Sequence, residues 1–348
     1  MSNLRSAPVD LQRRPSLLPF GGARRPFSFS TAEPKPITEI IPHRPPILMV
    51  DSYETFEIPT PPRKVGKVEK PRPPKLCVTA WKELKETDAV WEGKGMDLNF
   101  FPEFMAQSTG PLIVAEGLGD QVPLFAGVED LNIVPTQLRP GDTIQAKVLL
   151  DLKMGPMRSF IGEVKLGDEV IANCKFDIVI APASAIPQWK ESEEYIGPSY
   201  RESRDLMDLL SLSRTQLFVD HVDQIGLRTR QIHAGYTHPL SHPINQGHYP
   251  GNPIFMGIKQ VTAARQALQL FASVASGSGV AGFEDMTRTI GIGLSKVEWR
   301  SVVRSGDRID IRVSNIKIEG ELITADAELS KEDSQVASVI TGLKIKKI

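Results

Sequence analysis

The sequence predicts an α+β protein in which one unit, a buried helix wrapped by a long antiparallel sheet, occurs twice. Apolar residues recur at helical spacing in two separate segments, which indicates two core helices. Segments with alternating apolar and polar residues, typical of strands, follow each helix. Because opening segment, helix and strands come in the same order in both halves, the sequence indicates an internal duplication.

Length and composition set limits on the function. A chain of 348 residues is long enough for two domains. The formal net charge is −1 and no run of Lys or Arg forms a basic stripe, which argues against a nucleic-acid partner. Cys77 and Cys174 show neither a disulfide framework nor a metal-binding spacing, so we expect no metal and no cofactor. No apolar run approaches the ~20 residues that a membrane-spanning helix needs.

Residues 1–36 differ from the rest of the chain. They are rich in Arg and Ser, contain only Asp10 and Glu33 as acids, and lack the periodic apolar pattern of a core. Two interpretations stay open: a disordered tail on a cytoplasmic protein, or a mitochondrial transit peptide. The segment RPFS at residues 25–28 resembles a mitochondrial processing site.

The first unit is predicted to span residues 37–182. It opens with IPHRPPILMVD at residues 41–51, and the Pro- and Lys-rich residues 56–75 indicate an extended insertion after the first strand. An apolar helix begins near Phe100, and Pro111 is expected to kink it near Gln107. Strands follow, with Gly141 and Asp142 forming a turn between two of them.

The second unit is predicted to span residues 203–348, after a Glu-rich linker at residues 183–202. Residues 213–220 are a weaker copy of the opening segment, and Gly306 and Asp307 repeat the turn. The second helix is defined by a buried stripe at three- and four-residue spacing: Ile258, Val261, Ala264, Leu268 and Phe271.

Two motifs point to chemistry. QGHYPGNP at residues 246–253 presents His248 on a tight Pro/Gly turn just ahead of the second helix. EFMAQSTG at residues 103–110 places Glu103 on the first helix. Together they resemble the catalytic segments of FabZ-type 3-hydroxyacyl-ACP dehydratases, in which Gly-His-Phe-Pro-Gly-x-Pro precedes a helix that carries Glu-Ala-Met-Ala-Gln-Ala-Thr-Gly. The resemblance covers nearly everything from residue 37 onward and implies a double hotdog fold.

The resemblance also implies one composite site. In the family, one protomer supplies the histidine and its partner supplies the acid. Here, the position of the acid that would follow His248 is Thr262, and the position of the histidine that would precede Glu103 is Ala89. His248 and Glu103 therefore form one complementary pair, and the pair Ala89 and Thr262 is predicted to be inactive.

The chemistry of dehydration assigns a role to each residue. His248 suits removal of a C2 proton because the pKa of a histidine lies near neutrality. A carboxyl group suits protonation of the leaving C3 hydroxyl, and burial is expected to raise the pKa of Glu103 and keep it protonated. At the start of the second helix, the Gly257 N–H is expected to stabilise the enolate. Gly251, Tyr249 and Gln107 are expected to contribute to substrate binding, and His43 to structural hydrogen bonding.

The implied function is dehydration of a 3-hydroxyacyl thioester to a trans-2-enoyl thioester, in fatty-acid or polyketide-type biosynthesis. The partner implied is an acyl carrier protein or a CoA-linked acyl substrate. The two halves would form a pseudo-dimer within one chain, which itself could form a homodimer. Because hotdog folds also host other functions, a non-catalytic acyl-binding partner and a hotdog thioesterase remain as alternatives.

Overall fold

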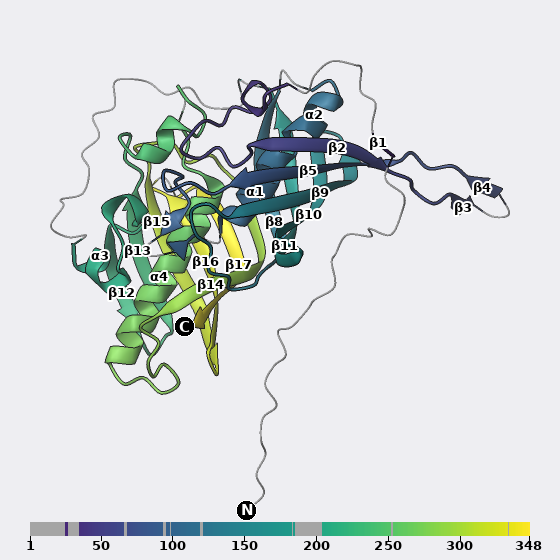
Figure 1. Ribbon diagram of the computed structural model, residues 1–348. Coiled ribbons are helices and arrows are strands. Elements are labelled where there is room, and N and C mark those ends of the chain that lie inside the picture. Colours follow the sequence, from purple (N-terminus) through teal and green to yellow (C-terminus); the bar gives the residue numbers. More distant parts are fainter. Residues whose placement is uncertain are drawn as a thin grey trace, which may run out of the picture.

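The structure is a computed structural model in which one curved sheet is folded around two central helical segments (Figure 1). The residues that it describes are 25–26, 35–65, 68–92, 95–97, 99–118, 121–182, 184, 204–251, 253–332 and 334–348. Apart from residue 184, the predicted linker at residues 183–202 lies outside this part of the chain, as do most of residues 1–36.

The first half supplies six long strands to the main sheet. They are β2 (Ser52–Ile58), β5 (Lys75–Glu83), β8 (Val122–Ile133), β9 (Thr143–Met154), β10 (Met157–Leu166) and β11 (Glu169–Ala181). Short strands accompany them: β1 (Arg25–Pro26), β3 (Arg63–Val65), β4 (Val68–Lys70), β6 (Trp91–Glu92) and β7 (Gly95–Met96).

The second half supplies another six strands. They are β12 (His221–Gly226), β13 (Gln231–Thr237), β14 (Thr289–Trp299), β15 (Arg308–Glu319), β16 (Leu322–Lys331) and β17 (Val336–Lys347). In the described residues the sheet order is β1-β2-β5-β9-β10-β11-β8-β14-β17-β16-β15-β13-β12. Read inward from either edge, the two sets of six strands follow the same sequence of connections, as a duplicated unit requires.

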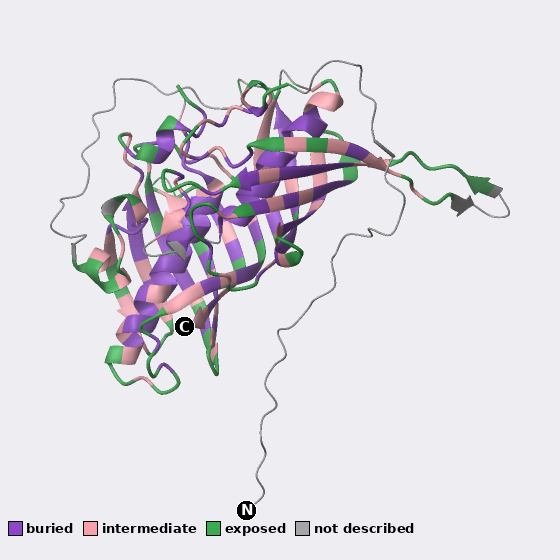
Figure 2. Ribbon diagram, viewed as in Figure 1, coloured by how far each residue is buried: buried purple, intermediate pink, exposed green. Residues whose placement is uncertain are grey.

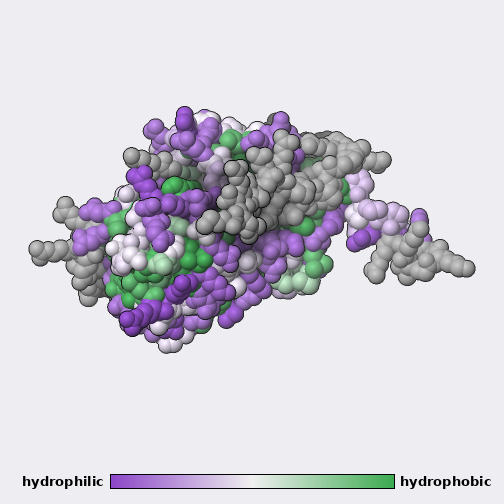
Figure 3. All heavy atoms as spheres, turned by 90° about the horizontal axis from the view of Figure 1, so that it is seen from below, coloured by the Kyte–Doolittle hydropathy of each residue, from purple (hydrophilic) through white to green (hydrophobic). Residues whose placement is uncertain are grey.

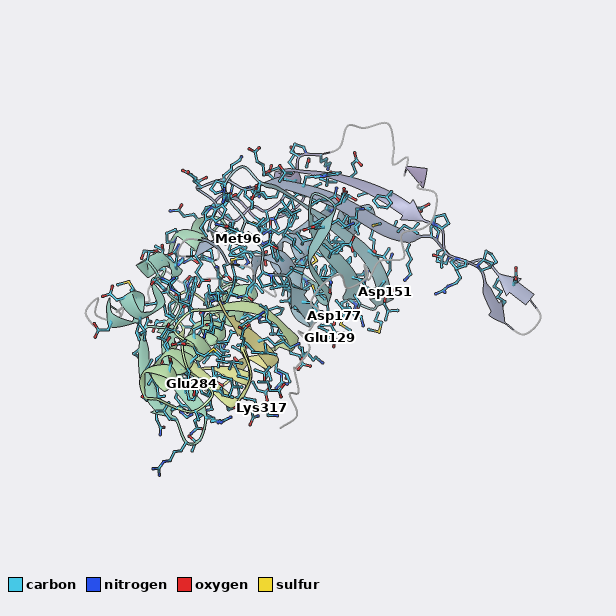
Figure 4. The ribbon with its side chains drawn as sticks, turned by 60° about the horizontal axis from the view of Figure 1, so that its bottom comes forward. Met96, Glu129, Asp151, Asp177, Glu284 and Lys317 are labelled. Carbon is cyan, nitrogen blue, oxygen red and sulfur yellow. The ribbon has the colours of Figure 1, made fainter. Side chains whose placement is uncertain are left out.

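The seam between the halves is an antiparallel pair of strands, β8 and β14. Val297 lies opposite Val128, and Lys296 lies opposite Glu129. The Lys296 and Glu129 side chains form an exposed ion pair at 3.5 Å, and Glu129 is labelled in Figure 4. The backbone pairing therefore fuses two sheets into one continuous sheet, and the exposed ion pair contributes little to it.

Two helical segments fill the concave side of the sheet. The helix α4 (Gly257–Gly277) runs unbroken through the second half, and every residue of its predicted apolar stripe is buried. The first half has α1 (Phe100–Ser108) followed by α2 (Gly110–Ala115). Figure 2 shows that α1 and α4 are mostly buried. The remaining helices are α3 (Arg204–Leu210) and the 3-10 turns η1 (Ile37–Glu39), η3 (Arg214–Gln216) and η4 (Pro243–Gln246).

The break between α1 and α2 is the expected effect of Pro111. The helix is interrupted at Thr109, two residues beyond the predicted kink at Gln107. Proline has no N–H to donate and sits in the first turn of the new helix, where that donor is not needed. The equivalent stretch of α4 has no proline and continues without a break.

Equivalent hydrogen bonds recur in the two halves. The side-chain Oε1 of Gln107 on α1 accepts a bond from the Met49 N–H at 2.8 Å. In the second half, Oε1 of Gln266 on α4 accepts one from the Phe218 N–H, also at 2.8 Å. In each unit, a buried glutamine thus joins the central helix to the opening segment. The same bond satisfies the buried oxygen of the glutamine side chain.

The predicted Gly-Asp turns also match. The Asp142 side chain accepts a hydrogen bond from the Arg139 N–H at 2.7 Å, and Asp307 accepts one from Arg304 at 2.9 Å. Both glycines between them have a positive φ, +95° and +94°, which favours glycine over any other residue. The turn was predicted from sequence, and its geometry is the same in both units.

Two expectations about the first half need correction. Residues 56–75 do not form one extended insertion: β2 continues to Ile58, a β3–β4 hairpin projects from the body, and β5 begins at Lys75 (Figure 1). Residues 1–36 are not wholly separate from the fold, since Arg25 and Pro26 pair with Glu57 and Phe56. Without β1, β2 would be the edge strand of the main sheet, and its free N–H and C=O groups pair with Arg25 and Pro26, whereas β3 and β4 pair only with each other.

None of the helices in the described part of the chain is long and apolar enough to cross a membrane. On the face shown in Figure 3, hydrophilic residues cover most of the described surface, and hydrophobic residues form separate patches.

Candidate active site

The loop that carries His248 is fastened to the opening segment of the first half. The His248 N–H donates to the carbonyl of Ile244 at 3.0 Å, and the Gly247 carbonyl accepts a bond from the Arg44 N–H at 2.9 Å. A Cβ on Gly247 would lie 2.2 Å from the Arg44 oxygen, so this close approach requires glycine. The loop of one half is thereby held against the other half.

The imidazole of His248 is buried and offers one defined nitrogen. Its Nδ1 lies 2.9 Å from the backbone carbonyl of Ile254. A carbonyl can only accept a hydrogen bond, so Nδ1 carries the hydrogen and Nε2 keeps the lone pair. This arrangement sets the tautomer that a general base needs.

Glu103 lies in the first turn of α1 and is also buried. Its Oε1 accepts a hydrogen bond from Gln107 Nε2 at 3.0 Å, and it lies 3.3 Å from Nε2 of His43. Gln107 is fixed in turn by the carbonyl of Ile47, to which the same Nε2 donates at 3.0 Å. The carboxylate is therefore aimed by its helix and by the opening segment.

The structure adds His43 to this site. The ligating atoms of His43, Glu103 and His248 all lie within 4.8 Å of one another, and the two imidazole rings are 5.3 Å apart. The Nδ1 of His43 is buried and has no hydrogen-bond partner among the described residues. The sequence marks His43 within the opening motif, but only the packing of that segment on α1 reveals its contact with Glu103.

Among the described residues, His43, Glu103 and His248 are also a group whose ligand atoms lie close enough together to bind a metal ion. Two imidazoles and a carboxylate form a ligand set that suits zinc. In the present arrangement, however, Glu103 Oε1 and His43 Nε2 face each other.

A cavity of about 250 Å³ opens beside these groups and is lined by both halves. The first half contributes His43, Glu103 and strand β8, and the second half contributes His248 and the end of β14. Apolar side chains extend the lining away from the polar groups: Ile41, Leu124, Phe125, Ile178, Trp299 and Val302. A narrow apolar space with a few convergent polar groups is the usual form of a small-molecule site.

Tyr249 anchors the histidine loop on the opposite side. Its hydroxyl donates to the carbonyl of Pro123 on β8 at 2.7 Å, and its ring lies 4.9 Å from that of His248. The φ of Tyr249 is +51°, an unfavourable backbone conformation for a bulky residue. Gly251 differs from the other predicted site residues, because it is exposed and its φ of +85° serves the turn after the histidine.

Gly257 is the first residue of α4 and lines the cavity. Its N–H is one of the first N–H groups of the helix, which have no acceptor within the helix itself. A Cβ on Gly257 would lie 2.7 Å from the indole of Trp299, whose Nε1 donates to the Gly257 carbonyl at 3.0 Å. The helix start can approach the cavity this closely because residue 257 has no side chain.

Comparisons with known proteins identify the family of the chain. A family model described as a FabA-like domain matches residues 212–340. The chain is 30% identical over 115 residues to the 3-hydroxyacyl-[acyl-carrier-protein] dehydratase FabZ of Campylobacter lari, an alignment that covers 30% of this chain and 70% of that protein. The FabZ of Chlamydia pneumoniae is 27% identical over 146 residues, which cover 38% of this chain and 92% of that protein. The chain belongs to the FabZ/FabA-like dehydratase family.

Membership of the FabZ/FabA-like family makes the chain a hydro-lyase of the dehydratase type. The double hotdog fold is confirmed by similarity to solved structures. One is the dehydratase domain of a mycocerosic acid synthase-like PKS, with a TM-score of 0.52, 12% identity, and coverage of 87% of this chain and 96% of that one. A second crystal form of that domain gives a TM-score of 0.51 at 12% identity, covering 88% and 96%.

The protonation state of Glu103 differs from the expectation. Burial alone would raise the pKa of this carboxyl group. The hydrogen bond and charge of His43, the charge of His248 and the hydrogen bond from Gln107 outweigh burial, so the pKa of Glu103 is lowered. The prediction that burial keeps Glu103 protonated is therefore wrong, because the surroundings of the carboxylate are polar on the side that faces the histidines.

His248 is shifted toward its neutral form. Burial is the main cause, and the charge of His43 adds to it, whereas Glu103 and the bond to Ile254 act in the opposite sense. The net result lowers the pKa of His248 to about 4. At neutral pH, the ring is therefore unprotonated and able to accept a proton at Nε2.

The second position of this FabZ-like protein has lost its pair. Ala89 lines a separate cavity of about 250 Å³. The histidine that lines this cavity is His242, and both of its ring nitrogens are engaged: Nδ1 accepts from the Ile244 N–H at 3.2 Å, and Nε2 lies 3.1 Å from the carbonyl of Thr215. Thr262, in place of the acid, donates its hydroxyl to Asp97 at 2.8 Å. Among the described residues that line this cavity, the histidine is already engaged and no acid is carried by α4.

Proposed function

We propose that the chain removes water from a 3-hydroxyacyl thioester, carried by an acyl carrier protein or by CoA, and forms the trans-2-enoyl thioester. The reaction would serve fatty-acid or polyketide-type biosynthesis. One observation carries the proposal: His248 and Glu103 come from opposite halves and meet beside one apolar cavity. The names of the curated relatives, which are 3-hydroxyacyl-[acyl-carrier-protein] dehydratases, support the same substrate class.

The first step in this proposal is proton removal. His248 Nε2 takes a proton from C2, and the electron pair moves toward the thioester carbonyl. The developing negative charge on the oxygen is stabilised by the Gly257 N–H at the positive end of the α4 dipole. The electrons then form the C2–C3 double bond as the C3–O bond breaks, and the hydroxyl leaves with a proton from Glu103.

Glu103 has to receive a proton for this step, because its lowered pKa leaves it ionised. His43 is placed to supply that proton. Its Nε2 lies 3.3 Å from the carboxylate, and its Nδ1 has no partner among the described residues. A proton that arrives at Nδ1 allows the one on Nε2 to pass to Glu103. The C2 proton held by His248 then returns to His43, and the cycle closes with one water released.

The test is product analysis with acyl-ACP and acyl-CoA substrates in parallel. The proposal expects enoyl thioester and water from the wild type. His248→Asn and Glu103→Gln are each expected to lower the rate by about 10²-fold or more, since each removes one proton transfer. His233→Gln and Glu129→Gln, on strands β13 and β8, serve as matched controls that keep the wild-type rate. Free acid as the product would make the chain a thioesterase. Binding without turnover would make it an acyl-binding protein.

A further inference from the structure

A buried ionic network lies at the second position, where Lys259 also lines the cavity beside Ala89. Asp97 Oδ2 accepts a hydrogen bond from Lys259 Nζ at 2.8 Å and another from the Thr262 hydroxyl at 2.8 Å. Arg265 pairs with Glu92 and lies 3.8 Å from Asp97. Two acids from the loop around Ala89 thus face two bases of α4, and their charges cancel. At this position the carboxylate beside α4 belongs to Asp97, which lies outside the helix, and α4 itself carries Thr262.

Asp97 also fixes the start of α1. Its Oδ1 accepts hydrogen bonds from the backbone and side-chain nitrogens of Asn99, at 3.2 and 3.0 Å. Its carbonyl accepts from the N–H of Phe100, the first residue of α1, at 3.0 Å. Met96, labelled in Figure 4 between the two halves, shows where this loop lies. One carboxylate therefore holds the beginnings of both central helices.

The contact continues through Lys259. Its ammonium group lies 4.2 Å from the ring centroid of Phe100 and 5.1 Å from that of Phe218, so the cation is covered by aromatic faces. Lys259 and Asp97 are both almost completely buried. Breaking such a pair by removing one partner is costly, because the other charge is then left buried and unpaired.

The network lies close to the active groups along both helices. Lys259 is two residues beyond Gly257 on α4. Asp97 holds the N–H of Phe100, and Glu103 lies three residues further along α1, about 4.5 Å at 1.5 Å per residue. A shift of either helix start therefore moves a group of the active site by a similar amount.

We propose that the inactive position has become an ionic clamp, made of Asp97, Lys259 and Thr262, that positions Glu103 on α1 relative to Gly257 on α4. These are positioning residues, since they act on the substrate only through the two helices. The proposal rests on the proposed function for its kinetic readout. In this proposal, the second position no longer carries out chemistry and instead positions the groups of the His248/Glu103 site.

The test uses variants that keep the shape of the clamp and change its bonds. Thr262→Val removes the hydroxyl donor, and Thr262→Ser restores it. Lys259→Met removes the charge, and the double variant with Asp97→Asn removes both charges together. Arg158→Met is the matched control, since it breaks the partly buried 2.9 Å ion pair with Glu116 in the first half, outside the clamp.

The clamp predicts that kcat falls about tenfold to a hundredfold in Lys259→Met, while KM changes little, because misplacement of reacting groups acts on the chemical step. Thr262→Val is expected to lose part of kcat, and Thr262→Ser to recover it. The double variant is expected to regain thermal stability and to keep a low kcat. Arg158→Met is expected to lose stability with kcat unchanged. Folded Lys259→Met with wild-type kcat would overturn the proposal.

A readout without turnover separates this inference from the proposed function. NMR titration of the His248 imidazole reports the surroundings of that ring, to which the charge of Glu103 contributes. The clamp predicts a changed titration midpoint in Lys259→Met and none in Arg158→Met. If the wild type makes no enoyl product but the midpoint still moves, the function is wrong and the clamp stands. An unchanged midpoint in an active enzyme refutes the clamp alone.

Discussion

The buried state of His248 makes the acid side of the pH–rate profile a sharp test of the site. Burial, and then the charge of His43, lower the pKa of this imidazole to about 4. A histidine in water has a pKa of about 6.5. The general base should therefore stay neutral, and active, well below the pH at which an ordinary histidine becomes protonated.

The expected difference in rate at low pH follows from these two pKa values. At pH 5.5, a base with a pKa of about 6.5 is neutral in roughly one molecule in eleven, whereas one with a pKa of about 4 is almost fully neutral. The difference in rate is about tenfold. We therefore expect kcat/KM at pH 5.5 to lie within about twofold of its value at pH 7, since kcat/KM reports the free enzyme.

The alkaline side of the pH–rate profile depends on Glu103 and His43. Glu103 and His43 have to hold one proton between them, so activity should fall as the pH rises and that proton is lost. In His43→Gln, the strongest partner that favours ionised Glu103 is gone, and burial then raises the pKa of the carboxyl group. The alkaline limb should move to higher pH while kcat falls, because proton return to Glu103 is slower.

The assay is the initial rate of enoyl thioester formation between pH 4.5 and 9, with the wild type and His43→Gln measured in the same buffers. Folding is followed at each pH by circular dichroism, so that loss of structure is not mistaken for titration. An acid limb with its midpoint near 6.5 in folded wild type would refute the assignment of His248 as the buried base. An unshifted alkaline limb in His43→Gln would refute the role of His43.

Three further predictions concern packing, stability and the N-terminal segment. Gly257→Ala should lower kcat by about tenfold or more with the fold retained, since the new methyl group displaces the Trp299 indole from the helix start; wild-type kcat would remove Gly257 from the mechanism. Burial, and then His242, lower the pKa of His238 to about 3. The unfolded chain therefore binds one proton more than the folded chain between pH 6.5 and 3, and the free energy of unfolding should fall by about 1.4 kcal/mol per pH unit as the pH drops through this range. In urea titrations, His238→Gln should make this dependence of the unfolding free energy on pH less steep. Removal of residues 1–24 should leave melting temperature and turnover unchanged, while sequencing of the native N-terminus distinguishes a cleaved transit peptide from a retained tail.

Much of the fold was predictable because its signals are local and repeated. The apolar stripe of α4, the kink at Pro111 and the two Gly-Asp turns each follow from residues close together in the sequence. The internal duplication then predicted the arrangement of the second unit from that of the first, because both have the same order of elements. The pairing of His248 with Glu103 was implied by the resemblance to FabZ-type dehydratases, because the two motifs complement each other across the halves.

The parts that were not predictable depend on contacts between distant segments. His43 and Glu103 are brought together by packing of the opening segment on α1. This contact also reverses the expected direction of the Glu103 pKa, because burial and hydrogen bonding oppose each other and only the structure says which is larger. The bond between Asp97 and Lys259 spans 162 residues and carries no motif.

The clamp also explains why the inactive position should resist simple restoration. Ala89→His with Thr262→Glu returns the two residue types that the family uses. The new glutamate, however, would stand beside Asp97. Burial opposes ionisation of Asp97, but Lys259 and Arg265, with hydrogen bonds from Lys259 and Thr262, hold its pKa at about 2. The buried network would then contain one more carboxylate than its Lys and Arg side chains neutralise.

We therefore expect the double variant to lose stability, by about 3 kcal/mol if the added carboxylate stays unpaired, and to gain no second site. Adding Asp97→Asn restores the charge balance and should recover the melting temperature, because the helix-borne acid then takes over the partners of Asp97. Titration with a mechanism-based inhibitor counts the sites: one per chain in the wild type and in the double variant. Two sites per chain in the double variant would show that Asp97 does not block the position.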